Sequence, residues 1–79
     1  MKIATKKMIQ KEIAPYVKID GLFLYIEPVD VQTLTEKLLA EYSNIYCGIS
    51  GGETECPVFI VKAKNNHNIF YKIFVEREF

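Results

Sequence analysis

The most informative stretch of the chain is YVKIDGLFLYIE, residues 16–27, in which an Asp-Gly pair separates two apolar runs. Such a pair is the strongest short-range signal for a β-hairpin, because its residues suit the backbone of a type I′ turn. We therefore predict a two-residue turn at Asp20 and Gly21. The cross-strand pairs counted outward from this turn are Ile19 with Leu22, Lys18 with Phe23, Val17 with Leu24 and Tyr16 with Tyr25.

The two faces of this hairpin differ in chemistry, because successive side chains of a strand point to opposite sides. One face is aliphatic and is predicted to join the core: Val17, Ile19, Leu22, Leu24 and Ile26. The other face is aromatic and is edged by charge: Tyr16, Lys18, Phe23, Tyr25 and Glu27. The candidate partner-binding residues are Tyr16, Lys18, Phe23 and Tyr25.

The aromatic face has three possible interpretations. Aromatic side chains beside a rim lysine are typical of protein interfaces. They also resemble in composition the platforms on which single-stranded RNA or DNA stacks, although the basic-Gly-aromatic signature of RNA-recognition domains is absent. In the third interpretation, the N-terminal helix covers them. The expected function is protein binding, and the alternative is a single-stranded RNA- or DNA-binding domain that uses the aromatic sheet face.

A short N-terminal helix is predicted in KKMIQKEIA, residues 6–14. Thr5 can cap it and Pro15 would end it. Met8, Ile9 and Ile13 form a narrow apolar side, and so short a helix is stable only when it packs. We favour a packed helix, which could cover the aromatic face, over a semi-independent basic helical arm formed by residues 1–14.

The main helix is predicted in VQTLTEKLLAEY, residues 31–42, with Asp30 as its cap. Its apolar residues recur at helical spacing: Val31, Leu34, Leu38 and Tyr42, with Leu39 beside them. This stripe is expected to pack on the aliphatic face of the hairpin. A cofactor-binding role for the stripe is much less common than a place in the core.

The two cysteines are predicted to be cross-strand neighbours. IYCGI reads as a strand, and a two-residue turn at Gly51 and Gly52 would lead into TECPVFIVKAK. Counting from that turn places Cys47 opposite Cys56 in a non-hydrogen-bonded pair, at the short end of the disulfide range. Both thiols are expected to be reduced in a cytoplasmic setting.

The last third of the chain reads as a second long hairpin, residues 58–64 and 69–77, joined by residues 65–68. One predicted apolar set is Phe59, Val61, Ala63, Tyr71, Ile73 and Val75. The other is mixed with charge: Val58, Ile60, Phe70 and Phe74 with Lys62, Lys64, Lys72 and Glu76. The predicted fold is a single α+β domain, residues 1–79, with a short helix, a hairpin, the main helix and a three-stranded meander. Its strands are expected to form one antiparallel sheet with the main helix on one face.

Composition limits the possible classes. With 79 residues, 49% hydrophobic and 13% aromatic, the chain suits one globular domain rather than a disordered segment. Its longest apolar run is five residues, far below the roughly 20 that span a membrane. The N-terminus lacks the apolar region of a secretory signal. A cytoplasmic protein without a membrane partner is therefore expected.

The formal net charge is zero, but the charges are segregated. Residues 1–21 carry +3, residues 22–56 carry −5 and residues 57–79 carry +2. The acidic middle argues against binding to duplex DNA. Segregated charge favours a protein partner or self-association. Together with the small core and the half-apolar second face of the last hairpin, it indicates a homodimer, with a monomer as the alternative.

No motif indicates catalysis. GISGGE, residues 48–53, lacks the Lys-Ser/Thr of a phosphate-binding loop. Cys47, Cys56 and His67 do not have a common zinc spacing, and Glu53 and Glu55 are expected to be exposed loop residues. We expect no enzyme, no cofactor and no metal. Size and the absence of motifs suggest a small regulator or inhibitor of phage or mobile-element type that acts by occluding a partner protein.

Overall fold

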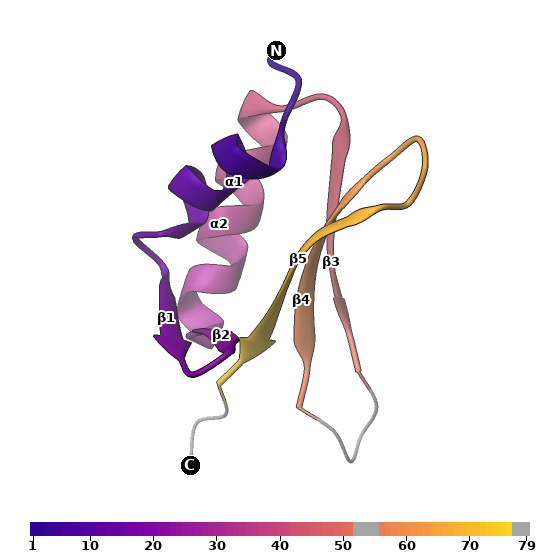
Figure 1. The fold of residues 1–79 in the computed structure, drawn as a ribbon. Helices are drawn as coiled ribbons and strands as arrows, with labels where there is room; N and C mark the ends of the chain where they lie inside the picture. The colour runs from indigo at the N-terminus through magenta and orange to yellow at the C-terminus, as the bar shows by residue number, and fades with distance from the viewer. Residues whose placement is uncertain (52–55, 77–79) are drawn as a thin grey trace.

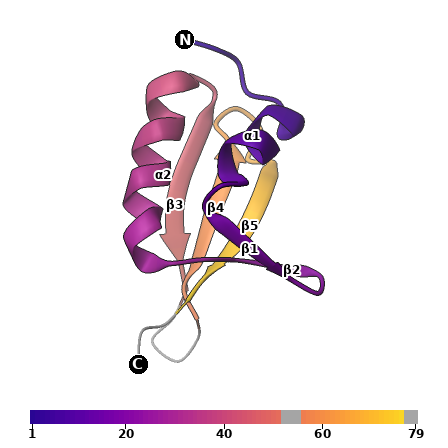
Figure 2. The same cartoon turned by 90° about the vertical axis from the view of Figure 1, so that its left-hand side faces the viewer.

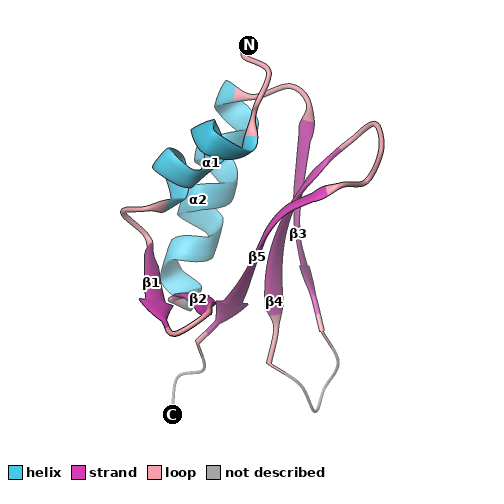
Figure 3. Ribbon diagram, in the orientation of Figure 1, coloured by secondary structure: helices cyan, strands magenta, loops and turns pink. Residues whose placement is uncertain are grey.

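The structure, a computed structural model, describes residues 1–51 and 56–76. Two helices and five strands follow one another along the chain: α1 (Lys6–Ile13), β1 (Val17–Asp20), β2 (Phe23–Ile26), α2 (Pro28–Glu41), β3 (Ile45–Ser50), β4 (Val58–Ala63) and β5 (Ile69–Val75). Both helices lie on the same side of one sheet (Figures 1 and 3). The prediction of a small α+β domain is confirmed.

The sheet is mixed, so the prediction of a purely antiparallel sheet is wrong. Its strand order is β1-β2-β5-β4-β3, and β2 runs parallel to β5. The reason is the path of α2, which carries the chain from β2 to the far edge of the sheet. Strands β3, β4 and β5 then lie side by side from that edge inward, so that β5 is next to β2 and runs in the same direction. Tyr25 lies beside Phe74 and Ile26 beside Val75, and the Glu76 N–H donates to the Ile26 carbonyl at 2.8 Å.

The first hairpin forms where it was predicted, but its register differs by two residues. Asp20 pairs with Phe23, so the turn residues are Gly21 and Leu22. Gly21 has the predicted positive φ, 63°, whereas Leu22 does not. This is the pattern of a type II′ turn, in which glycine takes the first central position instead of the second. A shift of two residues leaves the side chains of residues 17–20 and 23–26 on their predicted faces, but it moves Leu22 into the turn, where it is 98% exposed.

Helix α1 begins as predicted, with the Met8 N–H donating to the Thr5 hydroxyl at 3.3 Å. Ile9 and Ile13 are fully buried in the common core. The side view shows α1 and α2 in front of the same sheet face (Figure 2). The interpretation that α1 covers the aromatic face of the hairpin is therefore wrong. Its apolar residues Ile9 and Ile13 instead pack into the core on the other face of the sheet.

Helix α2 begins at Pro28, three residues before the predicted start. Proline suits the first helical position because the missing N–H would have no partner there. Asp30 consequently lies in the first turn and does not cap the helix. The predicted apolar stripe is confirmed by the burial of Val31, Leu34, Leu38 and Tyr42, whereas Leu39, which was expected beside them, is 41% exposed.

The predicted neighbourhood of the two cysteines is wrong. Cys47 pairs with Val61, and the β3–β4 ladder ends at Ser50 and Val58. The connection is thus seven residues long, from Gly51 to Pro57, rather than two. The predicted turn partners Gly52, Glu53 and Thr54 lie outside the described residues. Cys47 is buried, Cys56 is exposed, and both are free thiols.

The β4–β5 hairpin follows the predicted alternation over most of its length. Phe59 pairs with Ile73 and Val61 with Tyr71 on the helix side. The register shifts between Val61 and Lys62, so that Lys62 pairs with Ile69 and Phe70 leaves the alternation. Arg77, the predicted end of this hairpin, lies outside the described residues.

The core lies between the two helices and the sheet. Its fully buried side chains come from every element except β1: Ile9, Ile13, Ile26, Leu34, Leu38, Ile45, Phe59, Val61 and Ile73. From the predicted aliphatic face of the first hairpin, Ile26 is buried, whereas Ile19 remains 74% exposed at the sheet edge. Among the described residues, no helix has both the length and the apolar character to cross a membrane.

Candidate functional site: the open face of the sheet

Both helices cover one face of the sheet, and no described element covers the other. We call this second side the open face. Strand alternation and register assign it side chains from all five strands: Lys18, Asp20, Phe23, Tyr25, Tyr46, Ser50, Val58, Ile60, Lys62, Ile69, Lys72 and Phe74. Aromatic and aliphatic groups thus predominate at its centre, and lysines are spread across it.

Three aromatic rings form a cluster where β2 meets β5. The Phe23 and Phe74 ring centroids are 5.5 Å apart with the planes at 70°, and those of Tyr25 and Phe74 are 5.7 Å apart at 34°. Both are favourable pair geometries for aromatic side chains. Phe23 is 53% exposed, and the other two rings are half-buried. We call Phe23, Tyr25 and Phe74 the aromatic cluster.

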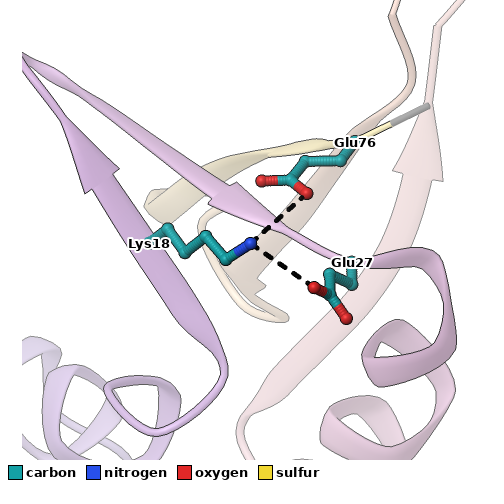
Figure 4. A network of polar contacts seen from close by, with 3 residues as sticks. All are labelled: Lys18, Glu27 and Glu76. Atoms are coloured by element: carbon teal, nitrogen blue, oxygen red, sulfur yellow. Dashed lines mark hydrogen bonds and ion pairs between the residues drawn. The ribbon is translucent and has the colours of Figure 1, made fainter. Parts of the chain in front are cut away.

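A lysine with two carboxylates forms the rim of this cluster. The Lys18 Nζ lies 3.4 Å from the Glu27 Oε1 and 3.8 Å from the Glu76 Oε2 (Figure 4). The three residues come from β1, from the start of α2 and from the end of β5. Because all three side chains are partly exposed, the pairs contribute little to stability. Their effect is on the local charge, because the two carboxylates together outweigh the single positive charge of Lys18.

Three of the four predicted site residues share this face, and the fourth does not. Lys18, Phe23 and Tyr25 lie together as strand alternation predicts. Tyr16 precedes β1, and its N–H donates to the Ile13 carbonyl at 2.9 Å in the turn that follows α1. Its ring therefore lies on the helix side, 5.7 Å from the Lys37 Nζ.

Phe74 was not among the predicted site residues, although the sequence placed it in the charge-mixed set of the second hairpin. Phe74 lies next to Phe23 because β2 and β5 pair in parallel. The pattern of apolar residues within one strand does not show which strands pair.

A second aromatic position lies at the opposite end of the open face. Tyr46 of β3 is 52% exposed, and its ring centroid is 5.3 Å from the Lys62 Nζ. A Cβ at Gly48 would come within 2.9 Å of the Tyr46 ring, so glycine leaves the ring room to lie along the strand. The ring borders a hollow of about 300 Å³ that His67 also lines.

The helix side has a separate groove between α2 and β3, with a volume of about 450 Å³. Its lining is mostly apolar: Pro28, Val31, Gln32, Thr35, Cys47, Gly48, Ile49, Phe59 and Val75. Burial raises the pKa of the Cys47 thiol to about 11, because the thiolate would lose its hydration there. A cysteine with a raised pKa is a poor nucleophile at neutral pH.

The candidate chemical residues do not form a site together. Cys47 lies on the helix side of the sheet, whereas His67 lines hollows next to Tyr46 on the open face. In the parts of the chain that the structure describes, no three His, Cys, Asp or Glu residues are grouped as metal ligands would be. Glu53 and Glu55 lie outside the described residues.

The open face offers rings, aliphatic surface and spaced charges, which are groups for non-covalent contact with a partner. Neither a protein-family model nor a curated protein nor a solved structure matches this chain.

Proposed function

We propose that this chain is a non-enzymatic protein-binding module that docks its partner on the aromatic cluster. In the proposed mechanism it acts as a small regulator or inhibitor, of the kind that phages and mobile elements encode, by occluding a surface of the partner. Phe23 and Tyr25 are the central contacts, Phe74 packs against both rings from the neighbouring strand, and Lys18 belongs to the rim.

The observation that carries this proposal is the exposure of Phe23 in the aromatic cluster, at one end of the uncovered face of the sheet. A phenylalanine that is 53% exposed leaves apolar surface in water, at an unfavourable free energy that a partner can remove. The Phe23 ring packs against Phe74, which also packs against Tyr25, and this contact restricts the Phe23 side chain before binding. Rigid aromatic anchors of this kind are common binding hot spots.

The charges around the cluster favour a protein over a nucleic acid. A domain that stacks bases needs cations free to contact phosphates. Here the rim lysine is already paired with Glu27 and Glu76, which leaves the rim with a net negative charge.

The alternative function, binding of single-stranded RNA or DNA, is favoured by a different observation. A second hollow, of about 280 Å³, is lined by Tyr46, Lys62, Ala63, Lys64 and His67, so none of its described lining residues is acidic. An exposed ring beside lysines is the arrangement on which a base stacks while the lysines contact phosphates. The two functions thus use opposite ends of the open face and can be tested separately.

The experiment compares three forms of the protein as bait in an extract of the native host: the unaltered chain, Phe23→Ala and Ile19→Ala. Ile19 is an exposed apolar residue on the helix side of the same hairpin and serves as the matched control. The proposal predicts a protein that the unaltered chain and Ile19→Ala retain at physiological salt, also after nuclease treatment, and that Phe23→Ala loses. Equal retention by all three baits would contradict the proposed surface. Nucleic acid that is retained at low salt, and lost in a Tyr46→Ala bait, would favour the alternative.

A further inference from the structure

The sheet has two edges, β1 and β3, and only one of them is protected against pairing with another strand. Strand β1 is four residues long and carries Lys18 and Asp20. Strand β3 is six residues long, IYCGIS, and contains no charged residue and no proline. Charged residues, proline and short length are the usual means by which proteins keep an edge strand from pairing with another chain. β3 lacks all of them.

The hydrogen-bond pattern shows which groups of β3 remain available. The Lys64 N–H donates to the Asn44 carbonyl at 2.9 Å, which makes this facing pair a hydrogen-bonded one. Such pairs alternate along an antiparallel ladder, so every second residue of β3 turns its N–H and C=O groups away from β4. These residues are Ile45, Cys47 and Ile49. Within the described part of the chain, no side chain or backbone segment forms a hydrogen bond with them on the outer side.

The residues that line the groove next to this edge are uncharged as well. Helix α2 lies alongside β3 (Figure 2), and the uncharged Pro28, Gln32 and Thr35 line the groove between them. Leu39 follows Thr35 by four residues, so it extends the same flank of the helix, and it is 41% exposed. Ile49 on the strand below is 60% exposed.

The opposite flank of α2 is charged and already occupied. It carries Lys37, which lies 4.0 Å from Glu12 of α1. The partly apolar flank of α2 is thus the one that faces the open edge of the sheet, with Glu36 at its outer side, where the carboxylate accepts from the Gln32 amide at 3.2 Å.

We infer that β3 and the adjoining flank of α2 form a two-fold interface between two copies of this chain. Around a two-fold axis each residue meets its own counterpart or a close neighbour, so a charged strand would repel itself, whereas β3 does not. With the axis at Cys47, Ile45 pairs with Ile49 of the second copy, and all three outward-facing residues find partners. The two sheets then join into one of ten strands, with Leu39 and Ile49 buried between the copies.

Sedimentation velocity at rising protein concentration tests this interface with a matched pair of variants. Ile49→Lys places a charge on the β3 edge, and Ile19→Lys places one on the β1 edge at a similarly exposed isoleucine. We expect the unaltered chain and Ile19→Lys to reach the dimer mass, and Ile49→Lys to raise the dimer dissociation constant about tenfold or more. Circular dichroism of each variant verifies that it is folded.

Amide hydrogen exchange of the unaltered chain gives a readout that does not depend on any variant. The Ile45, Cys47 and Ile49 amides should exchange quickly in the monomer and slowly in the dimer, whereas those of Tyr46 and Gly48 should be protected in both. A chain that stays monomeric up to millimolar concentration would overturn the inference. So would a dimer that Ile19→Lys weakens as much as Ile49→Lys. Protection of the three amides only after a different protein is added would assign the edge to that protein and would equally contradict a dimer.

Discussion

The ring of Phe74 on β5 meets the ring of Phe23 on β2 edge-on, with the centroids 5.5 Å apart and the planes at 70°. The two residues are 51 positions apart in the sequence, and they meet because β2 and β5 are parallel neighbours. This contact joins the first hairpin to the meander on the open face. On the helix side, the register places Ile26 next to Val75 and joins the same two strands.

Phe23 should contribute much less to stability than a core phenylalanine, although both are ring residues of the same sheet. We expect Phe23→Ala to lower the free energy of unfolding by about 1–2 kcal/mol, from the lost ring contact and partial burial. Phe59→Ala empties a position that is 1% exposed and should lower it by about 3–5 kcal/mol. Urea unfolding followed by circular dichroism compares the two. Equal losses would mean that Phe23 is a core residue.

Gly21→Val should destabilise the first hairpin through its backbone alone. The φ of Gly21 is +63°, a region that a β-branched residue avoids, yet a Cβ there would meet no atom within 4 Å. We expect a loss of about 1–3 kcal/mol in the free energy of unfolding. The control is Leu22→Ala in the same turn, which should change stability by less than about 0.5 kcal/mol because Leu22 is 98% exposed. A Gly21→Val protein as stable as the control would contradict the turn geometry.

The two thiols should react at very different rates in the folded protein. Cys56 is exposed, whereas Cys47 is buried and its pKa is raised to about 11, so that little thiolate forms near neutral pH. A thiol reagent at pH 8 should therefore modify one cysteine quickly and the second only slowly. Cys56→Ser should remove the fast phase. Two fast phases in the folded chain would contradict the burial of Cys47.

The same shift predicts the sign of a stability change at alkaline pH. The unfolded chain loses the Cys47 proton near the usual pKa of 9.0, and the folded chain loses it near 11. Between these values the folded state binds more protons, so stability falls as pH rises through this range. Cys47→Ala should reduce the slope of stability against pH between 9 and 11. An unchanged slope would contradict a thiol pKa raised by burial.

The parts of the fold that could be predicted from the sequence are those in which periodicity reports burial directly. The stripe of α2 follows from the spacing of Leu34 and Leu38, and the helix side of the second hairpin from the alternation of Phe59 and Val61. In both elements, the spacing alone identifies the buried side chains, whichever surface they pack against. The positive φ of Gly21 could likewise be predicted, because only the local turn requires it.

The parts that could not be predicted depend on how distant segments meet. The parallel pair of β2 and β5 follows from the path of α2, for which a local pattern has no signal. Asp-Gly and Gly-Leu both give two-residue turns with the same facial alternation, so the pattern did not decide whether glycine was first or second in the turn. The position of Cys56 depended on a two-residue turn that is in fact a seven-residue connection.

The candidate site shows the same limits. Alternation along one hairpin was enough to place Lys18, Phe23 and Tyr25 together. It was not enough for Tyr16, which precedes the strand, or for Phe74, which arrives from the other end of the chain.

The most direct measurement of the proposed function is the calorimetric affinity of the purified partner, once identified, for the unaltered chain, Phe23→Ala and Ile19→Ala. A hot-spot aromatic residue contributes about 2 kcal/mol or more, so Phe23→Ala should weaken binding by roughly 30-fold, while Ile19→Ala leaves it unchanged. The affinity should also depend only weakly on salt, because Lys18 is already paired with Glu27 and Glu76. An affinity that Phe23→Ala leaves unchanged would contradict the proposal that the aromatic cluster is the binding surface.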